Sequence, residues 1–421
     1  MAKRVYGQAA KTVTPEEALD LVLRFSHMTA PEIVSLSEAG GRTLDQDVIA
    51  AEPLPGNDRS LADGFAVGRE DLTVAAQGKP LRLNVRDGNC SADAEIPSGT
   101  AVRLSAGETI PPGTGAVCRF EAAHVTWDGR RQVVDIPGPV RPWENIVRRG
   151  EEIARGTRVL AAGSVVGPAE AAVLAALGFA RVSVRRKPVV AVLAIGPQPV
   201  DAGADPQSGR VRASNSRGIA VLAERAGCTV LEAGLCADDI DRLSQAIVDA
   251  ARKADAVITT GGISVGDYDL LPAIYDLIGA ETLFRRVNMQ PGSLCRFAVR
   301  EGKPILGLPG DVTAAFACAQ LFAVPAMRRM AGRAEAVPRW IGAELAAGFV
   351  QPKADRVRYT GGTAYIRDGR LRVEMTGSGN RPSDLWEGLL GANCLIRQRE
   401  RELPGPGGTV DLMLTDAVGI R

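Results

Sequence analysis

The sequence predicts a multidomain α/β protein whose central part is a doubly wound, mostly parallel β-sheet. At 421 residues the chain is too long for one ordinary hydrophobic core, so two to four domains are expected. Between residue 187 and about residue 330, apolar runs alternate with amphipathic stretches, as the strands and helices of a parallel sheet do. On either side, at 46–140 and after residue 333, short alternating segments between Gly and Pro turns predict smaller β domains.

The composition excludes several classes of protein. Lys and Arg number 50 against 49 Asp and Glu, so a net charge of +1 gives no general attraction to nucleic acid or to an anionic membrane. No apolar stretch approaches the roughly 18 residues of a spanning helix, and the first residues lack the apolar core of a signal peptide. Seven scattered cysteines without a C-x-x-C pair, and only two histidines, predict a cytoplasmic protein with reduced thiols and disfavour His-based zinc chemistry.

The first elements in chain order are a capped helix and a set of short strands. In VTPEEALDLVLRFS (13–26), Thr14 is the candidate N-cap, Pro15 suits the first helical position, and Glu17 sits where a capping box places its acid. LRLNV and RQVVDIP are typical strands of a small β domain. A second helix is predicted in GPAEAAVLAALG (167–178).

The central region follows as alternating strands and helices. PVVAVLAIG is a continuous apolar run, as expected of a strand covered on both faces. The next helix, SNSRGIAVLAERAG, has Ser214 or Asn215 as its candidate cap. The remaining predicted elements are the strands CTVLEAG, DAVITTGG and KPILGLPG, the helices ADDIDRLSQAIVDAARKA and AAFACAQLFAVPAM, and the later strands RLRVEM and GGTVDLMLTD.

A glycine-rich turn followed by acids leaves one of these strands. Ligands of a parallel sheet bind beyond the carboxyl ends of its strands, which is where TTGGISVGDYD falls. Gly261 and Gly262 would let a phosphate or ring approach the backbone, and Ser264 adds a hydroxyl. Asp267 and Asp269 have the chemistry to hold Mg²⁺ against a phosphate. A tight turn with helix-capping aspartates explains this stretch equally well.

Two more glycine turns favour the ligand interpretation. LGLPGDVTAAFA (306–317) repeats the order of strand, Pro-Gly turn, acid and helix, and NMQPGS (288–293) lies between the two. Three such turns in one predicted sheet indicate a ligand-binding edge.

Several motifs together resemble one family. TTGGISVGDYD resembles the signature of the molybdopterin-binding domain in the molybdopterin molybdenumtransferases, to which the gephyrin E domain is related. RSLADGFAV (59–67) resembles the family's Asp-Gly-Tyr-Ala segment, ENIVRRGEEI (144–153) its Arg-Gly-Glu-Asp segment, and GLPGD its Leu-Pro-Gly-Asn turn. SNS (214–216) and MTGSGNRPSDLWEGLLGANCLI also fall where the family has matching segments. The matches keep the family's order over nearly the whole chain.

The resemblance implies four parts, a homodimer and a reaction. The parts are a helical linker region (1–45 and 141–186), an inserted β domain (46–140), a molybdopterin-binding α/β domain (187–333) and a C-terminal β-barrel-like domain (334–421). The active site is expected between the α/β domain of one subunit and the inserted domain of the other. The implied reaction inserts molybdate into adenylated molybdopterin and releases AMP, assisted by Mg²⁺. Molybdoenzymes and other cofactor-synthesis proteins are the implied protein partners.

The resemblance also implies roles for particular residues. Asp63, Glu152 and Asp267 are expected to be catalytic, and Asp267 and Asp269 to bind the metal. From the residues alone, Asp63 reads as an Asp-Gly turn and RRGEE as a solvated charge run. The residues expected to bind the pterin ligand are Ser214, Asn215, Gly261, Gly262, Ser264, Gly266, Pro291, Gly292, Pro309, Gly310, Asp311 and Ser378.

The chain departs from the family pattern at its presumed oxyanion and metal sites. Pro197 and Gln198 replace two acids, Gln290 and Ser293 replace two lysines, Val312 and Ala314 replace a proline and a serine, and Ala106 replaces a threonine. DRVRYTGG (355–362) also lacks an arginine that the family places there, and Arg285, Arg286 or Arg296 are candidates to restore the charge.

These losses leave three functions open. The first is molybdenum insertion itself. The second is a non-catalytic paralogue that binds molybdopterin or the finished cofactor as carrier, store or sensor. The third is a structural scaffold.

Overall fold

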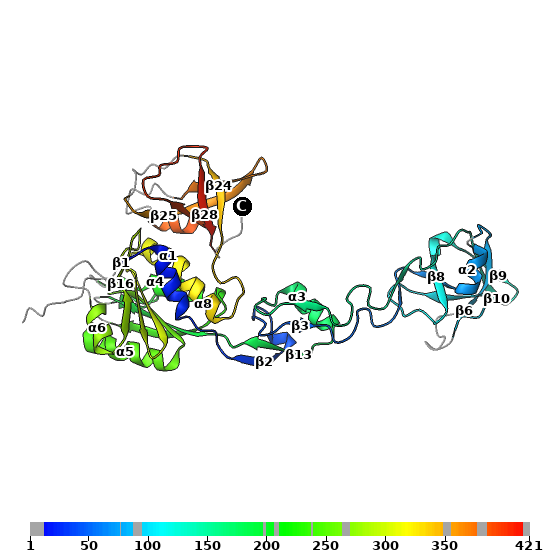
Figure 1. Cartoon of the computed structure of the whole chain (residues 1–421), viewed down its shortest axis with the longest axis horizontal. Helices are drawn as coiled ribbons and strands as arrows, with labels where there is room; N and C mark the ends of the chain where they lie inside the picture. Colours follow the sequence, from blue (N-terminus) through cyan, green and yellow to red (C-terminus); the bar gives the residue numbers. More distant parts are fainter. Residues whose placement is uncertain are drawn as a thin grey trace, which may run out of the picture. The chain divides into compact units, whose positions relative to one another are not determined.

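The computed structural model describes residues 12–75, 77–86, 95–196, 199–205, 210–236, 239–262, 270–347, 355–376 and 385–415 (Figure 1). The chain divides into two compact units. Unit 1 comprises residues 1–46, 162–167 and 181–421, and unit 2 comprises 47–161 and 168–180. Among the described residues, no helix is long and apolar enough to cross a membrane.

Unit 1 contains the predicted doubly wound sheet, which confirms the fold class. The strand order is β17-β14-β18-β23-β22-β19; the first four strands run parallel and the last two are antiparallel to their neighbours. The strands are β14 (Val189–Ile195), β17 (Thr229–Cys236), β18 (Ala256–Gly261), β19 (Glu281–Phe284), β22 (Arg296–Arg300) and β23 (Lys303–Leu308).

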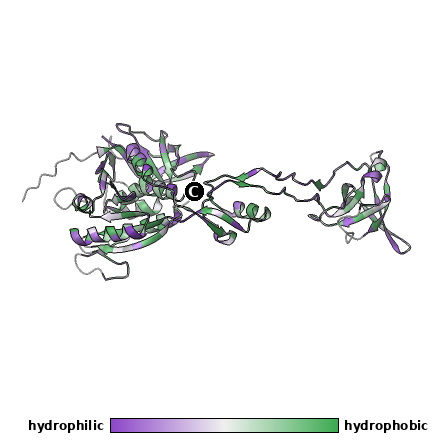
Figure 2. Ribbon diagram, turned by 60° about the horizontal axis from the view of Figure 1, so that its bottom comes forward, coloured by the Kyte–Doolittle hydropathy of each residue, from purple (hydrophilic) through white to green (hydrophobic). Residues whose placement is uncertain are grey.

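Helices cover both faces of this sheet because its strands are apolar on both sides. Val190, Val192 and Ile258 pack with α4, α7 and α8, whereas Leu193 and Val257 pack with α5 and α6. These helices carry both apolar and polar segments, as the hydropathy colouring in Figure 2 shows. They are α4 (Ser214–Arg225), α5 (Ile240–Lys253), α6 (Leu271–Leu277), α7 (Val312–Cys318) and α8 (Val324–Met330), the last two joined by a π-helical turn, Ala319–Ala323.

The N-terminal helix α1 (Pro15–Arg24) begins as the sequence predicts. The Thr14 hydroxyl accepts the Glu17 N–H at 3.2 Å, and the Glu17 carboxylate accepts the Thr14 N–H at 2.9 Å. Its Ala18 and Val22 are buried in the same core as α4 and α8. Short pairings in the same unit join β1 (Thr12–Val13) to β20 (Arg286–Val287), β2 (Pro31–Ser35) to β13 (Arg181–Arg185), and β15 (Pro199–Val200) to β16 (Val211–Arg212).

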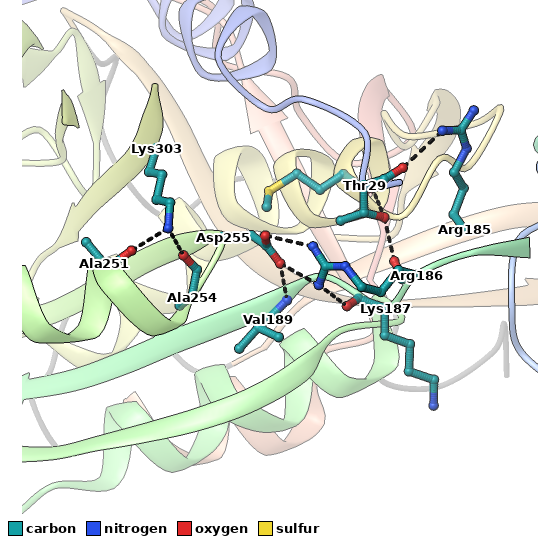
Figure 3. A network of polar contacts seen from close by, with 10 residues as sticks. Thr29, Arg185, Arg186, Lys187, Val189, Ala251, Ala254, Asp255 and Lys303 are labelled. Carbon is teal, nitrogen blue, oxygen red and sulfur yellow. Dashed lines mark hydrogen bonds and ion pairs between the residues drawn. The ribbon is translucent and has the colours of Figure 1, made fainter. Parts of the chain in front are cut away.

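Polar contacts hold the amino ends of the parallel strands (Figure 3). The two Nη atoms of Arg186 donate to the Asp255 carboxylate at 2.8 and 3.0 Å, and the Val189 N–H donates to the same group at 2.7 Å. Lys303 Nζ donates to two carbonyl oxygens at the carboxyl end of α5, at 2.6 and 3.0 Å. These contacts lie at the edge of the sheet opposite to the one where ligands are expected.

The C-terminal part of unit 1 is a closed five-stranded barrel. The hydrogen-bonded order β25-β26-β24-β28-β27 returns to β25, and the two-residue strand β21 (Met289–Gln290) pairs with the first two residues of β25. The buried Asn393 bonds both backbone groups of Ala364, at 2.6 and 2.9 Å, which ties the predicted Ala-Asn segment to the barrel. The elements are β24 (Trp340–Leu345), β25 (Val357–Arg367), β26 (Arg370–Met375), α9 (Leu385–Gly391), β27 (Cys394–Gln398) and β28 (Thr409–Leu414).

Unit 2 is built on a six-stranded sheet of order β8-β5-β7-β6-β10-β9. Its apolar core includes Phe65, Leu83 and Val134. The strands are β5 (Gly64–Gly68), β6 (Leu81–Arg86), β7 (Thr100–Leu104), β8 (Thr114–Arg119), β9 (His124–Asp128) and β10 (Arg131–Ile136), with α2 (Arg69–Ala75) after β5. Two ribbons pair β4 (Arg59–Ser60) with β11 (Ile146–Val147) and β3 (Val48–Ile49) with β12 (Arg158–Leu160), and α3 spans Pro168–Ala176.

Candidate functional site

Three distant segments meet at the carboxyl edge of the unit 1 sheet. Asn215 Nδ2 donates to the Gly310 carbonyl at 2.9 Å and to the Thr260 hydroxyl at 3.3 Å. The Thr260 hydroxyl donates in turn to the Pro309 carbonyl at 3.3 Å. Both polar side chains are buried, and burying them is favourable only because they are hydrogen-bonded. The structure thus brings Asn215, Pro309 and Gly310 together at the end of β18.

The predicted helix cap near Asn215 is wrong. α4 starts at Ser214, and its N-cap is Ala213, which offers no side-chain bond. Ser214 is exposed in the first turn, whereas Asn215 turns inward to the bonds with Thr260 and Gly310.

The two glycines at the end of β18 are required by a neighbouring strand. Gly261 has φ +86°, and a Cβ there would lie 2.1 Å from the Ile195 carbonyl oxygen of β14. Gly262 has φ +65°, and a Cβ there would lie 2.5 Å from the Ile195 side chain. Close packing against β14 therefore explains both glycines, a reason that the sequence alone did not reveal. Their contact with a ligand stays a prediction.

Asp311 has a local structural role. It is the N-cap of α7, where its carboxylate accepts the Ala314 N–H at 2.8 Å. The two family departures beside it, Val312 and Ala314, are both buried in α7. Ser264, Gly266, Asp267, Asp269 and Ser378, together with Pro197 and Gln198, lie outside the described residues.

The third glycine turn does not lie on the α/β sheet, so the prediction of three turns on one sheet is wrong. Met289 and Gln290 pair with Val357 and Arg358 of the barrel instead, a long-range pairing without a local sequence signal. A cavity of about 440 Å³ opens at this junction. Its lining residues are Met289, Gln290, Pro291, Gly292, Ser293, Asp355, Arg356 and Arg358.

The wall of this cavity is fixed from behind by cysteines. The Gly292 carbonyl accepts the Cys295 N–H at 3.0 Å and the Cys318 thiol at 3.6 Å. Burial and the hydrogen bond with Cys295 raise the pKa of the Cys318 thiol, so that it stays protonated and able to donate. Gly292 has φ +97°, and a Cβ there would lie 2.5 Å from Cys318 Sγ. Only glycine fits between this sulfur and the cavity.

Two arginines supply the positive charge of the cavity. Arg358 is half-buried and its Nη2 donates to Gln290 Oε1 at 3.4 Å, while Arg356 is exposed beside the exposed Asp355. The family's own arginine is missing from 355–362, but the same stretch carries Arg356 and Arg358, neither of which was expected at the site. The signal was a pair of arginines two residues apart at the start of a strand, but only the β21–β25 pairing brings them to the turn.

The arginines suggested from sequence lie elsewhere. Arg296 is 5% exposed on β22, opposite Gly307 of β23, and burial lowers its pKa to about 10. Arg286 is exposed and pairs with β1, and Arg285 is half-buried. None of the three lines the cavity.

Unit 2 carries two of the expected acids. The Asp63 carboxylate accepts the Ala106 N–H at 2.8 Å, and the Asp63 carbonyl accepts the Phe120 N–H at 3.2 Å. Glu152 forms an exposed ion pair with Arg59 at 3.4 Å. Both acids are exposed, so both are accessible for chemistry, and both also satisfy a local structural role.

Comparisons with known proteins identify the family. Molybdopterin molybdenumtransferase from Staphylococcus aureus (strain MRSA252) is 35% identical over 415 residues, which is 96% of this chain and 95% of that protein. The chain belongs to the molybdopterin molybdenumtransferase family. The family member of the same name from Bacillus subtilis (strain 168) is 34% identical over 313 residues, 74% of this chain and 73% of its own.

Family models and solved structures agree with this assignment. Residues 13–178 match the MoeA N-terminal region (domain I and II), and residues 191–329 match a probable molybdopterin binding domain. Two crystal structures of a molybdopterin biosynthesis MoeA protein from Pyrococcus horikoshii are 26% identical to this chain, with TM-scores of 0.80 and 0.78. Each covers 96% of this chain, and the chain covers 99% and 100% of them.

Two of the positions at which the chain departs from the molybdopterin molybdenumtransferase family lie in the cavity. Gln290 and Ser293, in the expected lysine positions, both line the cavity beside Arg356 and Arg358. The described residues contain no group of three or more His, Cys, Asp or Glu side chains that could hold a metal ion. Asp201 follows closely in sequence the positions 197 and 198, where the family's two acids are replaced, and it forms an ion pair with Arg217 at 3.1 Å.

Proposed function

We propose that this chain is a molybdopterin molybdenumtransferase that inserts molybdate into adenylated molybdopterin and releases AMP. The observation that supports this most is the cavity at the 290–293 turn, which holds two guanidinium groups where the resemblance expects two lysines. The two guanidinium groups supply the positive charge that a doubly charged molybdate needs at this turn. The substitutions at 290 and 293 therefore do not argue against the enzyme.

The chemistry of the cavity suits a doubly charged oxyanion. Guanidinium groups stay protonated at every physiological pH and donate two parallel hydrogen bonds to an oxyanion. Ser293 adds a hydroxyl, whereas the carboxylate of Asp355 offsets part of the positive charge. Two cations against one anion leave the side chains of the lining with a net positive charge.

The pterin adenylate is expected at the neighbouring edge of the sheet. Gly261 and Gly310 bring two stretches of backbone without side chains together, with the Cβ position of Gly310 3.5 Å from Gly261 Cα, and the side-chain amide of the buried Asn215 donates to the Gly310 carbonyl. A phosphate or ring approaches such backbone closely. Ser214, Gly262, Pro309 and Asp311 belong to the same edge and keep their proposed binding role, as do Pro291 and Gly292 at the cavity.

The acids and the metal complete the proposal. Asp63 and Glu152 are proposed as acids supplied by the inserted domain, and Asp267 with Asp269 as the Mg²⁺ ligands. Aspartate carboxylates beside a phosphate are the usual protein ligands of Mg²⁺. The dependence of turnover on added Mg²⁺ tests the proposed metal site.

A cytoplasmic homodimer is the proposed assembly, with the other cofactor-synthesis proteins or a molybdoenzyme as partners. α3 supports the dimer, because only Leu174 of this apolar helix is buried. The alanines at 169, 172, 175 and 176 are exposed. Helices of this composition are normally covered.

A single-turnover assay tests the proposed function. Purified chain, adenylated molybdopterin, Mg²⁺ and molybdate are mixed, and AMP release is followed together with the metal retained on the pterin. Molybdate-dependent AMP release is the expected result. Tight binding of the adenylate without AMP release would instead identify the chain as a carrier, store or sensor of the cofactor.

A further inference from the structure

We infer that the positive charge expected at position 290 has moved across the β21–β25 pairing to Arg358, which binds the oxyanion while Gln290 orients it. The inference rests on the proposed function, because it assigns the oxyanion donor of that same site. Arg358 is a specificity-determining residue in this arrangement, and Gln290 is a positioning residue.

Strand register brings the two residues together. Gln290 is the direct partner of Arg358 in the parallel pairing, and the Arg358 guanidinium donates to the Gln290 amide oxygen at 3.4 Å. Partner side chains on neighbouring strands lie on the same face, where like charges repel each other. A lysine at 290 and an arginine at 358 would therefore repel, so this pair of positions accommodates one cation.

The neutral amide does more than avoid repulsion. Its oxygen accepts from one Nη of Arg358, which removes rotamer freedom from a long side chain before any ligand binds. The turn that carries Gln290 is itself fixed, since Val287 N–H donates to the Ser293 carbonyl at 3.0 Å and Cys318 holds Gly292. Arg358 is thus oriented by a rigid neighbour.

The second expected lysine has a counterpart of the same kind. Ser293 takes its position without charge, and Arg356 lines the same cavity two residues before Arg358. Two lysines on one turn are thereby replaced by two arginines across the cavity, one just before β25 and one within it. The ligand class this favours is a tetrahedral dianion such as molybdate or tungstate, whose paired oxygens match the planar guanidinium fork.

A charge-swap series tests the inference by direct binding. The full-length chain and the variants Arg358→Gln, Gln290→Lys and Gln290→Lys/Arg358→Gln are dialysed against molybdate, and bound molybdenum is quantified. Loss of a charged hydrogen bond predicts about tenfold or more weaker binding for Arg358→Gln. The double variant should recover to within about threefold of wild type, since it restores one cation to the pair. Gln290→Lys alone should bind no more tightly than wild type and melt at a lower temperature.

Controls separate binding from folding. Arg367→Gln removes an exposed arginine at the far end of β25 and should leave the affinity unchanged. Arg358→Lys keeps the charge but loses the planar fork, so it should bind with intermediate affinity and remain folded. Thermal melting of every variant identifies any that fail to fold.

The results also distinguish this inference from the proposed function. Unchanged affinity in Arg358→Gln, a double variant no better than Arg358→Gln, or absence of molybdate binding by the wild type would overturn the inference. Arg358-dependent molybdate binding in a chain that releases no AMP would uphold the inference and reject the enzyme. AMP release that does not depend on Arg358 would uphold the enzyme and reject the inference.

Discussion

Gly261 lies where β18 passes so close to β14 that no side chain fits. Its positive φ and the 2.1 Å approach of its Cβ position to the Ile195 carbonyl oxygen both restrict this residue to glycine. Asn215 at the same edge satisfies two polar groups from other segments, at Thr260 and Gly310. The residue types at the carboxyl edge of the sheet are therefore restricted by backbone packing and internal hydrogen bonds as well as by any ligand.

Gly261→Ala is expected to destabilise unit 1 by about 2–5 kcal/mol, the sum of left-handed backbone strain and overpacking. Gly196→Ala is the matched control, because nothing lies within 4 Å of its Cβ position. It should cost less than about 0.5 kcal/mol. Urea unfolding midpoints compare the two, and equal midpoints would show that the approach of β14 is not restrictive.

Asp255 gives the fold a pH-dependent contribution to its stability. Burial by itself raises the pKa of this carboxyl group, but Arg186 and the Val189 N–H outweigh burial and hold the pKa below its usual value. Such a group stabilises the fold above its unfolded pKa of about 3.9 and loses this contribution as the pH falls through the folded value. Asp255→Asn should therefore cost about 1–3 kcal/mol at pH 7.

The stability difference between wild type and Asp255→Asn should shrink as the pH falls below about 4. Unfolding measured between pH 7 and pH 3 checks this. Asp249→Asn removes an exposed ion pair with Arg252 and should cost less than about 1 kcal/mol at any pH. A difference for Asp255→Asn that grows in acid would contradict the assignment.

Among the elements, α7 connects the two parts of the site. Its N-cap Asp311 directly follows Gly310 at the sheet edge, and its last residue, Cys318, holds the Gly292 carbonyl behind the cavity. A rigid helix with one contact at each site keeps their spacing constant. The geometry of the edge and of the cavity is therefore set by one short element.

Asp311→Ala should destabilise this element by about 0.5–2 kcal/mol through loss of the cap, whereas Asp311→Asn should nearly match wild type. Hydrogen exchange of the Ala314 amide, which donates to Asp311, reports the change locally. If Asp311 instead serves only a ligand, both variants would exchange like wild type while adenylate binding falls.

The whole molecule is proposed to be a homodimer, and its mass in solution tests this. Sedimentation should give twice the 44.2 kDa mass of one chain. Ala172→Glu/Ala176→Glu places two charges on the exposed face of α3 and should shift the species to one chain. Ala346→Glu, at an exposed alanine of the barrel unit, is the control and should remain a dimer. A monomeric wild type, or a dimer that tolerates both glutamates, would exclude α3 as the interface.

The sequence by itself determined the features that depend on neighbours along the chain. The capping box of Thr14 and Glu17 formed as predicted because it involves residues three apart. The alternation of apolar strands and amphipathic helices specified a doubly wound sheet, and the order of the motifs pointed to the family. In each case the deciding interaction lies within one element or one motif.

Only the tertiary structure decided how the site is charged and why its glycines are there. Arg358 faces Gln290 across 68 residues of chain, and Asn215 reaches Gly310 across 95. Pairings at such distances depend on strand register and sheet closure, which leave no local pattern. The same reason explains the misplaced third turn and the assumed loss of two positive charges. Arg356 and Arg358 bring positive charge to the 290–293 turn from a segment that lies far from it along the sequence.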